Sequence, residues 1–514
     1  MQNFPECWNG ANPSMSFGDP QIVKSNTAPN TPVPKQVKAR PAWNYYLLAA
    51  GVAIGIASFV VNPPAGVNPN GWRALGLLIP IITIWATEAI PVGVASMVFL
   101  ALVAIFQLAP PAVAFRGFTG DLPWLILGAF TLGKAMEQTG FSKRLTYLLL
   151  SSLKGFWGTI LAIYVVNVCF MAVPSSEARS GVLAPFLNSI MATINRPTQS
   201  NLSRLITYNF CNATNAFVGN MFLTGGAANI VLVALFAQLT GINLGWGEWF
   251  ILMALPTLLF TIVASYFAWL FSRPEPELIA KMRDSQAMVA AYRAMGPMTA
   301  DEWKVLAIYV FAVCFWIIGG FLHVPPGFAA LVIMGVLFLP KIGVLPRQAI
   351  REINWDIVLL LGAVTGVAGI LDQTGMLKAI SNVLVAPILD PLAHYGLFGI
   401  AVGCILVGLI AHWLLPGPTN LTLAVPLLVT WGIQTQHLPM PIVLAFLVLL
   451  SALGDKLIML PYQVPTYYTF LAMDVTDVPR FNALLFKLYP ILAVTILIGA
   501  YITYGTMLLT GIGM

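Results

Sequence analysis

The sequence predicts an all-α polytopic membrane protein with about eleven transmembrane helices, two opposed re-entrant hairpins and an inverted internal repeat. Of the 514 residues, 58% are hydrophobic and only 9% are charged, whereas soluble domains carry roughly 25% charged residues. The chain also contains a duplicated pattern, because Leu-Gly-Ala-Phe-Thr at 127–131 and Glu-Gln-Thr-Gly at 137–140 match Leu-Gly-Ala-Val-Thr at 361–365 and Asp-Gln-Thr-Gly at 372–375. Membrane proteins with two matching halves typically bind a solute where the halves meet, so the repeat favours a secondary transporter.

The cysteine, histidine and charge content argues against several classes of protein. The five cysteines are scattered without a CxxC pair, and the four histidines lack the spacing of metal ligands, so we expect neither disulfides nor a structural metal site. No nucleophile–base pair points to an enzyme. The net charge of +6 does not predict nucleic-acid binding, because Lys and Arg in a membrane protein report orientation. We expect no cofactor, with Na⁺ or H⁺ as the candidate coupling ion.

Composition divides the chain into four segments. Residues 1–42 are polar and Pro-rich, which is typical of a disordered tail, and we expect this tail to be cytoplasmic. Residues 43–272 and 303–514 are predicted to be the two inverted repeats. The charged stretch at 273–302 is expected to form an amphipathic cytoplasmic connector on the membrane surface.

Apolar runs long enough to span a bilayer occur in both halves. If two broken pairs are re-entrant hairpins, most Lys and Arg residues between the spans fall on the same side as the tail. We therefore expect an integral protein of a bacterial inner membrane, with its N-terminus cytoplasmic and its C-terminus outside. The first half is expected to contain helices near 43–62, 71–92, 93–109 and 122–152, a broken pair at 157–197, an interrupted segment at 200–240 and a span at 248–272. The second half is expected to contain helices near 303–321, 326–346 and 354–392, a broken pair at 395–435, an interrupted segment at 441–473 and a span at 483–510.

Polar residues interrupt the apolar pattern at two hairpin tips, which correspond across the repeat. The first tip contains Ser175, Ser176 and Arg179, and the second contains Thr419 and Asn420. Non-helical backbone at membrane depth is tolerated only where it lines a cavity or is buried in protein. Hydroxyl and amide groups beside a helix N-terminus suit an anion, so these residues are candidate substrate ligands. The alternative is that they only cap helices.

Two further interruptions are predicted to unwind helices inside the membrane. One contains Gly225 and Asn229, and the other contains Gln463, Pro465 and Thr466. Carbonyl groups freed by an unwound helix can bind a cation, while the amide groups face an anion. We therefore add these five residues to the candidate substrate site. The alternative is a kink that serves only packing.

Charged residues at membrane depth are costly and therefore indicate function. Glu177 and Arg179 lie at the first tip, and Asp455 and Lys456 lie just before the second unwound segment. Arg179 is predicted to hold a substrate carboxylate as a bidentate fork. Glu177, Asp455 and Lys456 are candidates for ion coupling or charge compensation, and the alternative is two structural ion pairs. We assign Glu137, near a predicted helix end, a structural role.

The run at 85–91, the stretch at 128–140, the two hairpin tips and the two unwound segments together resemble the divalent anion/sodium symporter family of di- and tricarboxylate transporters. The resemblance covers roughly residues 43–510. It implies a homodimer in the lipid bilayer that carries a small organic anion. It also implies a scaffold part that holds the dimer and a transport part that moves like an elevator.

The sequence departs from the family at the residues that build sodium sites. Family members carry Ser-Asn-Thr at each tip, whereas only Ser175 of the first tip matches here. A fixed Arg179 or Lys456 could take the place of a sodium ion electrostatically, which would make the protein an anion exchanger. Glu177 could instead couple transport to protons, and sodium symport stays open as well.

A related cation or arsenite-type antiporter is the alternative from the same superfamily. Such a protein should place carboxylates at its centre, not Arg179. Two paired interruptions favour alternating access over a channel pore.

Overall fold

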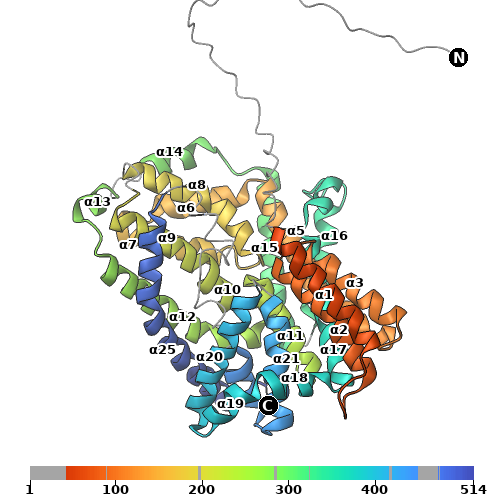
Figure 1. Ribbon diagram of the computed structural model, residues 1–514. Helices are drawn as coiled ribbons and strands as arrows, with labels where there is room; N and C mark the ends of the chain where they lie inside the picture. Colours follow the sequence, from red (N-terminus) through yellow and green to blue (C-terminus); the bar gives the residue numbers. More distant parts are fainter. Residues whose placement is uncertain are drawn as a thin grey trace, which may run out of the picture. The chain divides into compact units, whose positions relative to one another are not determined.

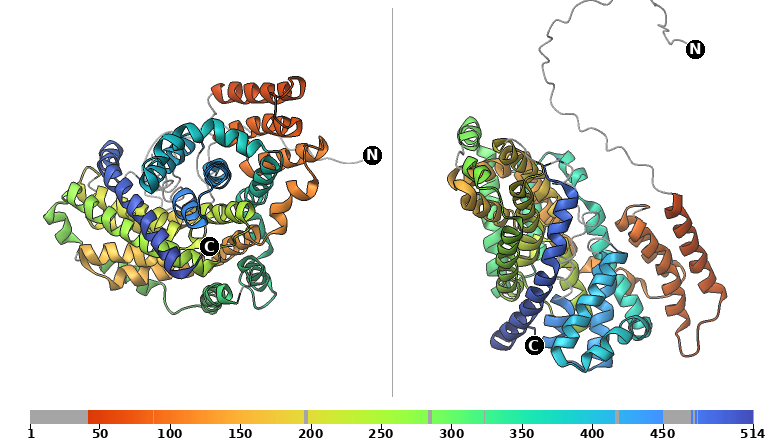
Figure 2. Two further views of the ribbon diagram at one scale, coloured as in Figure 1. Left: turned by 90° about the horizontal axis from the view of Figure 1, so that it is seen from below. Right: turned by 60° about the vertical axis from the view of Figure 1, so that its left-hand side comes forward.

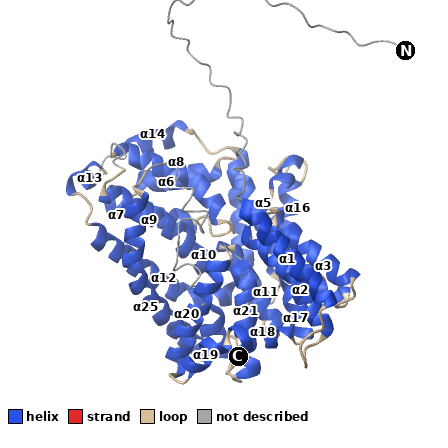
Figure 3. Ribbon diagram, viewed as in Figure 1, coloured by secondary structure: helices blue, strands red, loops and turns tan. Residues whose placement is uncertain are grey.

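The computed structural model describes residues 42–87, 89–194, 198–282, 286–322, 324–415, 419–449, 470, 473 and 475–513. Within these residues the regular elements are all helical, which confirms the all-α part of the predicted fold class (Figure 3). Residues 43–514 form one compact unit. Apart from Ala42, the predicted tail at 1–42 lies outside the described residues.

The helices of the first half follow the predicted apolar runs (Figure 1). They are α1 (Ala42–Val60), α2 (Pro69–Thr87), α3 (Val92–Ile105), α4 (Pro111–Ala114), α5 (Leu122–Gln138), α6 (Phe141–Ser152), α7 (Gly155–Val168), α8 (Ser176–Thr193), α9 (Asn201–Cys211), α10 (Val218–Met221), α11 (Ala227–Thr240) and α12 (Trp246–Ser272). A π-helix at Asn212–Phe217 joins α9 to α10, and 3₁₀ turns lie at Arg116–Thr119 and Leu223–Gly225.

The second half begins after two short connector helices. Its elements are α13 (Pro276–Lys281), α14 (Gln286–Ala294), α15 (Ala300–Phe321), α16 (Pro326–Phe338), α17 (Trp355–Gln373), α18 (Met376–Leu384), α19 (Ala386–Ala393), α20 (Gly396–Leu414), α21 (Thr419–Thr430), α22 (Met440–Ile442) and α25 (Val478–Thr510). A 3₁₀ turn covers Arg347–Glu352, and π-helices cover Trp431–Thr435 and Val443–Leu449.

The described helices include clear membrane spans. Four of them, α12, α15, α17 and α25, are long and apolar enough to cross a bilayer, and the bent pair α18–α19 brings the number to five. Several shorter apolar helices, such as α3, α7 and α11, accompany them. These findings support a polytopic membrane protein. The number of about eleven spans and the re-entrant hairpins stay predictions.

The structure corrects the two longest helices predicted from the sequence. The segments at 122–152 and 354–392 were expected to be single helices, but each is divided by a glycine. Gly140 separates α5 from α6 with φ of 80°, and Gly375 separates α17 from α18 with φ of 71°. Glycine adopts this left-handed conformation without a steric penalty and therefore stops helices. The Thr-Gly that ends each copy of the repeat is thus a helix stop.

The two halves exchange helix contacts in a reciprocal manner. α16 of the second half packs along α5 of the first, and α3 of the first half packs along α17 of the second. The Asp121 carboxylate accepts a hydrogen bond from the Gly327 amide (3.3 Å), and the Asp356 carboxylate accepts one from the Gly93 amide (2.7 Å). Asp121 and Asp356 therefore each cap a helix N-terminus of the opposite half, where negative charge is stabilising. We call α3–α17 and α5–α16 the crossed helix pairs.

Glycines permit the close approach of the crossed pairs. A Cβ atom at Gly93 would overlap the backbone oxygen of Asp356, and one at Gly327 would overlap that of Asp121. The last helices of the two halves, α12 and α25, also lie side by side (Figure 1). The red and orange-red helices α1 and α2 lie at the edge of the unit (Figure 2). Gly55 of α1 packs closely against the Gly76 carbonyl of α2.

A buried ion pair attaches the end of the connector to α6. The Arg144 guanidinium donates to the Glu302 carboxylate at 2.7 Å, and both side chains are buried. Arg144 also donates to the backbone carbonyls of Met295, Gly296 and Pro297. Because a buried charge requires both a partner and hydrogen bonds, this arrangement compensates the desolvation of the pair. The connector predicted at 273–302 is thus held at its C-terminal end.

Candidate functional site

The first predicted tip lies between α7 and α8. α7 ends at Val168, and α8 begins at Ser176 after a short turn. The Ser175 hydroxyl accepts a hydrogen bond from the Ala178 amide at 3.1 Å, so Ser175 is the N-cap of α8. This capping role is the alternative that the sequence left open, and it places the Ser175 side chain at the positive end of the helix dipole.

Arg179 is buried beside this tip, with only 1% of its surface exposed. Its Nη1 donates to the carbonyl oxygen of Val173, and its Nη2 donates to that of Thr214 at 2.7 Å. Thr214 belongs to the π-helix that follows α9. The guanidinium therefore bridges the first tip and the π-helix through two backbone carbonyls. A carboxylate clamp by Arg179 stays a prediction.

The first predicted unwound segment separates α10 from α11. Residues 222–226 form only a short 3₁₀ turn. The buried Asn229 amide donates to the carbonyls of Gly219 (2.6 Å) and Phe222 (2.9 Å), which satisfies acceptors released by the unwinding. A Cβ atom at Gly225 would overlap the Val218 carbonyl, so glycine is required for this close approach.

Hydrogen bonds join the first tip to the unwound turn. The Ala227 amide donates to the Pro174 carbonyl at 3.0 Å, and the Thr224 hydroxyl donates to the Met171 carbonyl at 2.8 Å. The Trp246 indole donates to the same hydroxyl at 3.1 Å. Because buried polar groups held in this way specify one arrangement, the tip and the turn form a single block. Sequence reasoning missed Trp246, which no local pattern linked to Thr224.

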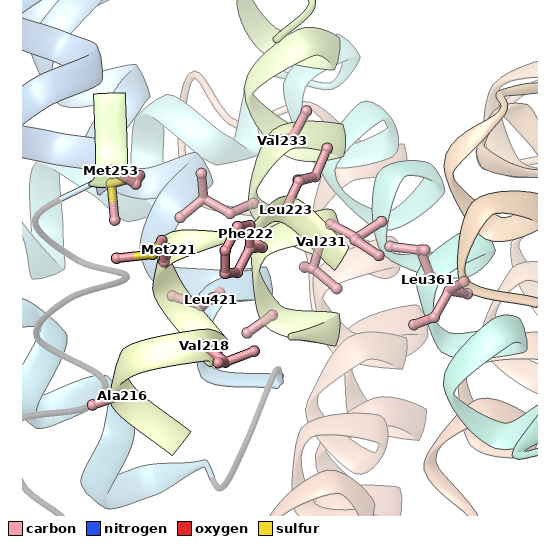
Figure 4. Close-up of a cluster of buried hydrophobic side chains, with 14 of the residues drawn as sticks. Ala216, Val218, Met221, Phe222, Leu223, Val231, Val233, Met253, Leu361 and Leu421 are labelled. Atoms are coloured by element: carbon pink, nitrogen blue, oxygen red, sulfur yellow. The ribbon is translucent and has the colours of Figure 1, made fainter. Parts of the chain in front are cut away.

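The second tip approaches this block through α21. α21 packs against α11, and Figure 4 shows Leu421 of α21 in the same buried apolar cluster as Val218 and Phe222. The structure thus brings α21, which begins at the second predicted tip, close to the first unwound turn.

Asn420 of the second tip contacts a histidine that the sequence analysis did not name. The Asn420 amide nitrogen lies 3.0 Å from Nδ1 of His412, and both side chains are buried. His412 is in the last turn of α20, just before the tip, and a histidine at the end of an apolar helix was the signal that could have found it.

Several predicted residues lie outside the described part of the chain. Gln463, Pro465 and Thr466 of the second unwound segment are among them, as are Asp455 and Lys456. Ser176 is the first residue of α8, and the backbones of Glu177 and Thr419 belong to the first turns of α8 and α21. The side chains of Glu177 and Thr419 lie outside the described atoms, so the roles predicted for them stay predictions.

A cavity of about 660 Å³ opens beside the first tip. Small-molecule sites typically measure roughly 300–1,000 Å³, so a di- or tricarboxylate fits. Its buried end includes Arg179, whereas Glu137 and Glu352 are 59% and 50% exposed. Its charged and polar lining residues are Lys134, Glu137, Ser142, Lys143, Tyr147, Ser175, Arg179, Glu352 and Asn354. Glu137 thus lines the cavity in addition to the structural role predicted for it.

Comparison with known proteins identifies relatives over most of the chain. Residues 42–510 match the model of a family described as the sodium:sulfate symporter transmembrane region. The chain is 25% identical over 343 residues to a putative malate transporter of Bacillus subtilis (strain 168), covering 65% of this chain and 70% of the relative. It is 26% identical over 387 residues to the chloroplastic dicarboxylate transporter 1 of Arabidopsis thaliana, covering 71% and 67%.

A further relative is matched over nearly its whole length. An L-tartrate/succinate antiporter of Escherichia coli (strain UTI89 / UPEC) is 24% identical over 488 residues, which is 88% of this chain and 97% of that protein. Family and relatives are transporters and not enzymes. The family match over most of the chain, together with the apolar helices, identifies an integral membrane protein. The chain therefore belongs to the divalent anion:sodium symporter family, as the resemblance in the sequence indicated.

Proposed function

We propose that this protein exchanges dicarboxylates across the membrane, one anion in each direction, without a coupled sodium ion. The names of its relatives support the substrate class, since they include malate and dicarboxylate transporters and a tartrate/succinate antiporter. The cavity beside the first tip has the size and the cationic lining that such an anion needs.

The contact of Arg179 with two backbone carbonyls carries the proposal for exchange. Carbonyl oxygens at interrupted membrane helices are typical sodium ligands. Here the guanidinium donates to two such oxygens, of Val173 and Thr214, and supplies a positive charge that cannot dissociate. The covalently attached charge takes the electrostatic place of a bound sodium ion.

A fixed charge has a consequence for the transport cycle. A symporter releases its sodium and its anion together, so its empty site returns without an added charge. With Arg179 at the site, an empty carrier would move this fixed buried cation through a region of low dielectric constant without the negative charge of a substrate, which is costly. A bound dianion would add negative charge beside the guanidinium during the movement. Return with an anion from the opposite side is therefore favoured over return of the empty site.

The proposed motion is of the elevator type, within a homodimer. The crossed helix pairs would be the fixed part, because caps and glycine contacts hold them rigidly. The block of first tip and unwound turn would move as one body, since hydrogen bonds join its parts. We place the N-terminus in the cytoplasm of a bacterial cell and the C-terminus outside, as the distribution of Lys and Arg favours.

Uptake of labelled succinate and citrate into proteoliposomes tests this function. The driving conditions would be a sodium gradient, a proton gradient, and unlabelled internal dicarboxylate with neither gradient. We expect rapid succinate uptake only with internal dicarboxylate. Uptake that requires sodium would overturn the exchange mechanism and indicate symport. Uptake that requires a proton gradient would assign the coupling to a carboxyl group such as Glu177. Citrate uptake would extend the substrate class to tricarboxylates.

A further inference from the structure

We propose that Lys134 forms a second carboxylate subsite, at the exposed end of the cavity, where an arriving dicarboxylate replaces Glu352 on the lysine ammonium. This inference rests on the proposed dicarboxylate transport. It adds a site that is separate from the two hairpin tips and the unwound turns.

The geometry around Lys134 resembles that of an occupied anion site. Lys134 Nζ lies 2.7 Å from a carboxylate oxygen of Glu352 and 3.1 Å from one of Glu137. The lysine side chain is only 21% exposed, whereas the two glutamates are 50% and 59% exposed. The protein thus holds the cation in the wall of the cavity and presents its two carboxylate partners from the solvent side. A substrate carboxylate is chemically equivalent to either partner.

Displacement of a glutamate from Lys134 should be inexpensive. Ion pairs between partly exposed side chains contribute little free energy, since water solvates the released carboxylate. Glu137 is three residues away on α5 and stays beside Lys134 as long as α5 is helical. Glu352 comes from the 3₁₀ turn ahead of α17, in the other half of the chain. A substrate carboxylate can therefore replace Glu352 on Lys134 while the contact between Lys134 and Glu137 within α5 is kept.

Lys134 and Arg179 line the same cavity, so a carboxylate bound at Lys134 is already in the cavity that contains the buried cation. Lys134 has exposed glutamate partners, whereas Arg179 is buried. The face of α8 at Ala178, Gly181 and Pro185 is exposed and lines this cavity as well. A Cβ atom at Gly181 would meet no neighbour within 4 Å. A dicarboxylate captured at Lys134 would therefore enter a cavity in which the α8 face at Gly181 leaves space for it.

Steady-state exchange kinetics test the subsite in proteoliposomes loaded with unlabelled succinate. In Lys134→Gln we expect the KM for labelled succinate to rise about fivefold with Vmax nearly unchanged, as loss of a partly exposed charge contact predicts. In Glu352→Gln we expect the KM to fall about twofold, because a competing carboxylate is removed from Lys134. Glu137→Gln should also lower the KM, but by less than Glu352→Gln. Raising the ionic strength should increase the KM of the wild type more than that of Lys134→Gln.

A matched control distinguishes a local subsite from a general charge effect. Lys304 makes an equivalent partly exposed ion pair with Asp301 at 2.8 Å, outside the cavity. Lys304→Gln should leave KM and its dependence on ionic strength unchanged. An unchanged KM in both Lys134→Gln and Glu352→Gln would overturn the proposal, and so would a pure loss of Vmax. If Lys134→Gln does not insert into the membrane, the KM of Glu352→Gln decides. Failure of the wild type to exchange succinate would instead refute the proposed function.

Discussion

The crossed helix pairs are alike in the two halves, whereas the hairpin tips are not. Asp121 caps α16 as Asp356 caps α3, and a glycine allows close contact in both places. At the tips, Arg179 bridges two backbone carbonyls in the first half, while Asn420 contacts His412 in the second. The crossed helix pairs have the same packing geometry in both halves, so the same residue types, an aspartate cap and a glycine, occur in both. Under the proposed function, the tips bind one solute together and need not match, so that a fixed charge in one half would suffice.

The largest effect is expected from Arg179→Ala, which removes the feature that distinguishes the tips. Removal of one partner of a buried, hydrogen-bonded charge pair between a protein and its ligand costs about 3 kcal/mol of binding, so we expect succinate exchange to fall by about a hundredfold. If the guanidinium takes the place of a cation, external sodium should restore part of the uptake in this variant. Labelled uptake with and without sodium measures both effects.

Two controls accompany this prediction. Arg293→Ala alters an exposed arginine of the connector helix α14 and should exchange succinate normally. Size-exclusion chromatography in detergent reports whether Arg179→Ala remains folded. Normal exchange by Arg179→Ala would remove the functional difference between the tips.

Gly181→Leu probes the first tip without altering a charge. The added side chain would project into the open cavity, since no atom lies within 4 Å of the position of its Cβ. We expect exchange to fall about tenfold through steric exclusion of the substrate, with little change in stability. Gly181→Ala, which adds only the Cβ, should keep most of the activity. Equal activity of the leucine and alanine variants would mean that this part of the cavity is not on the substrate path.

Gly93→Ala and Gly327→Ala test whether the crossed pairs are energetically equivalent. Each added methyl group would overlap a backbone oxygen of the opposite half, so each variant should lose about 1–3 kcal/mol of stability. Thermal unfolding in detergent should show similar decreases in Tm for both variants. Gly335→Ala on α16, where a Cβ atom would meet nothing within 4 Å, is the control. A large decrease for only one of the two variants would break the proposed equivalence.

The smallest effect is expected at the second tip. Replacement of His412 by Leu removes its contact with Asn420, and a single hydrogen bond contributes about 1 kcal/mol. We therefore expect a rise in the KM for succinate of about fivefold. His412→Gln retains a polar group that can contact the Asn420 amide, so its KM for succinate should rise less. If His412→Leu matched Arg179→Ala in its loss of exchange, the two tips would be equally important.

Local sequence determined most of the helical architecture. The apolar runs predicted the fold class, and the Gly, Pro and polar interruptions marked the first tip and the first unwound turn, where α8 and α11 begin. Hydropathy and helix-breaking residues act within a few turns of helix, so they can be seen in a short window of sequence.

Tertiary structure alone decided which groups meet. Arg179 donates a hydrogen bond to the Thr214 carbonyl, which is 35 residues away in the sequence. The Asp356 carboxylate accepts one from the Gly93 amide, at a separation of 263 residues. Lys134 meets Glu352 of the other half. The helix stop at Gly140 also escaped prediction, although a glycine after the polar run at 137–139 is a known stop signal, and its φ of 80° ends α5. Such contacts depend on how packed helices bring distant residues together, and this packing is a property of the whole chain rather than of any local segment.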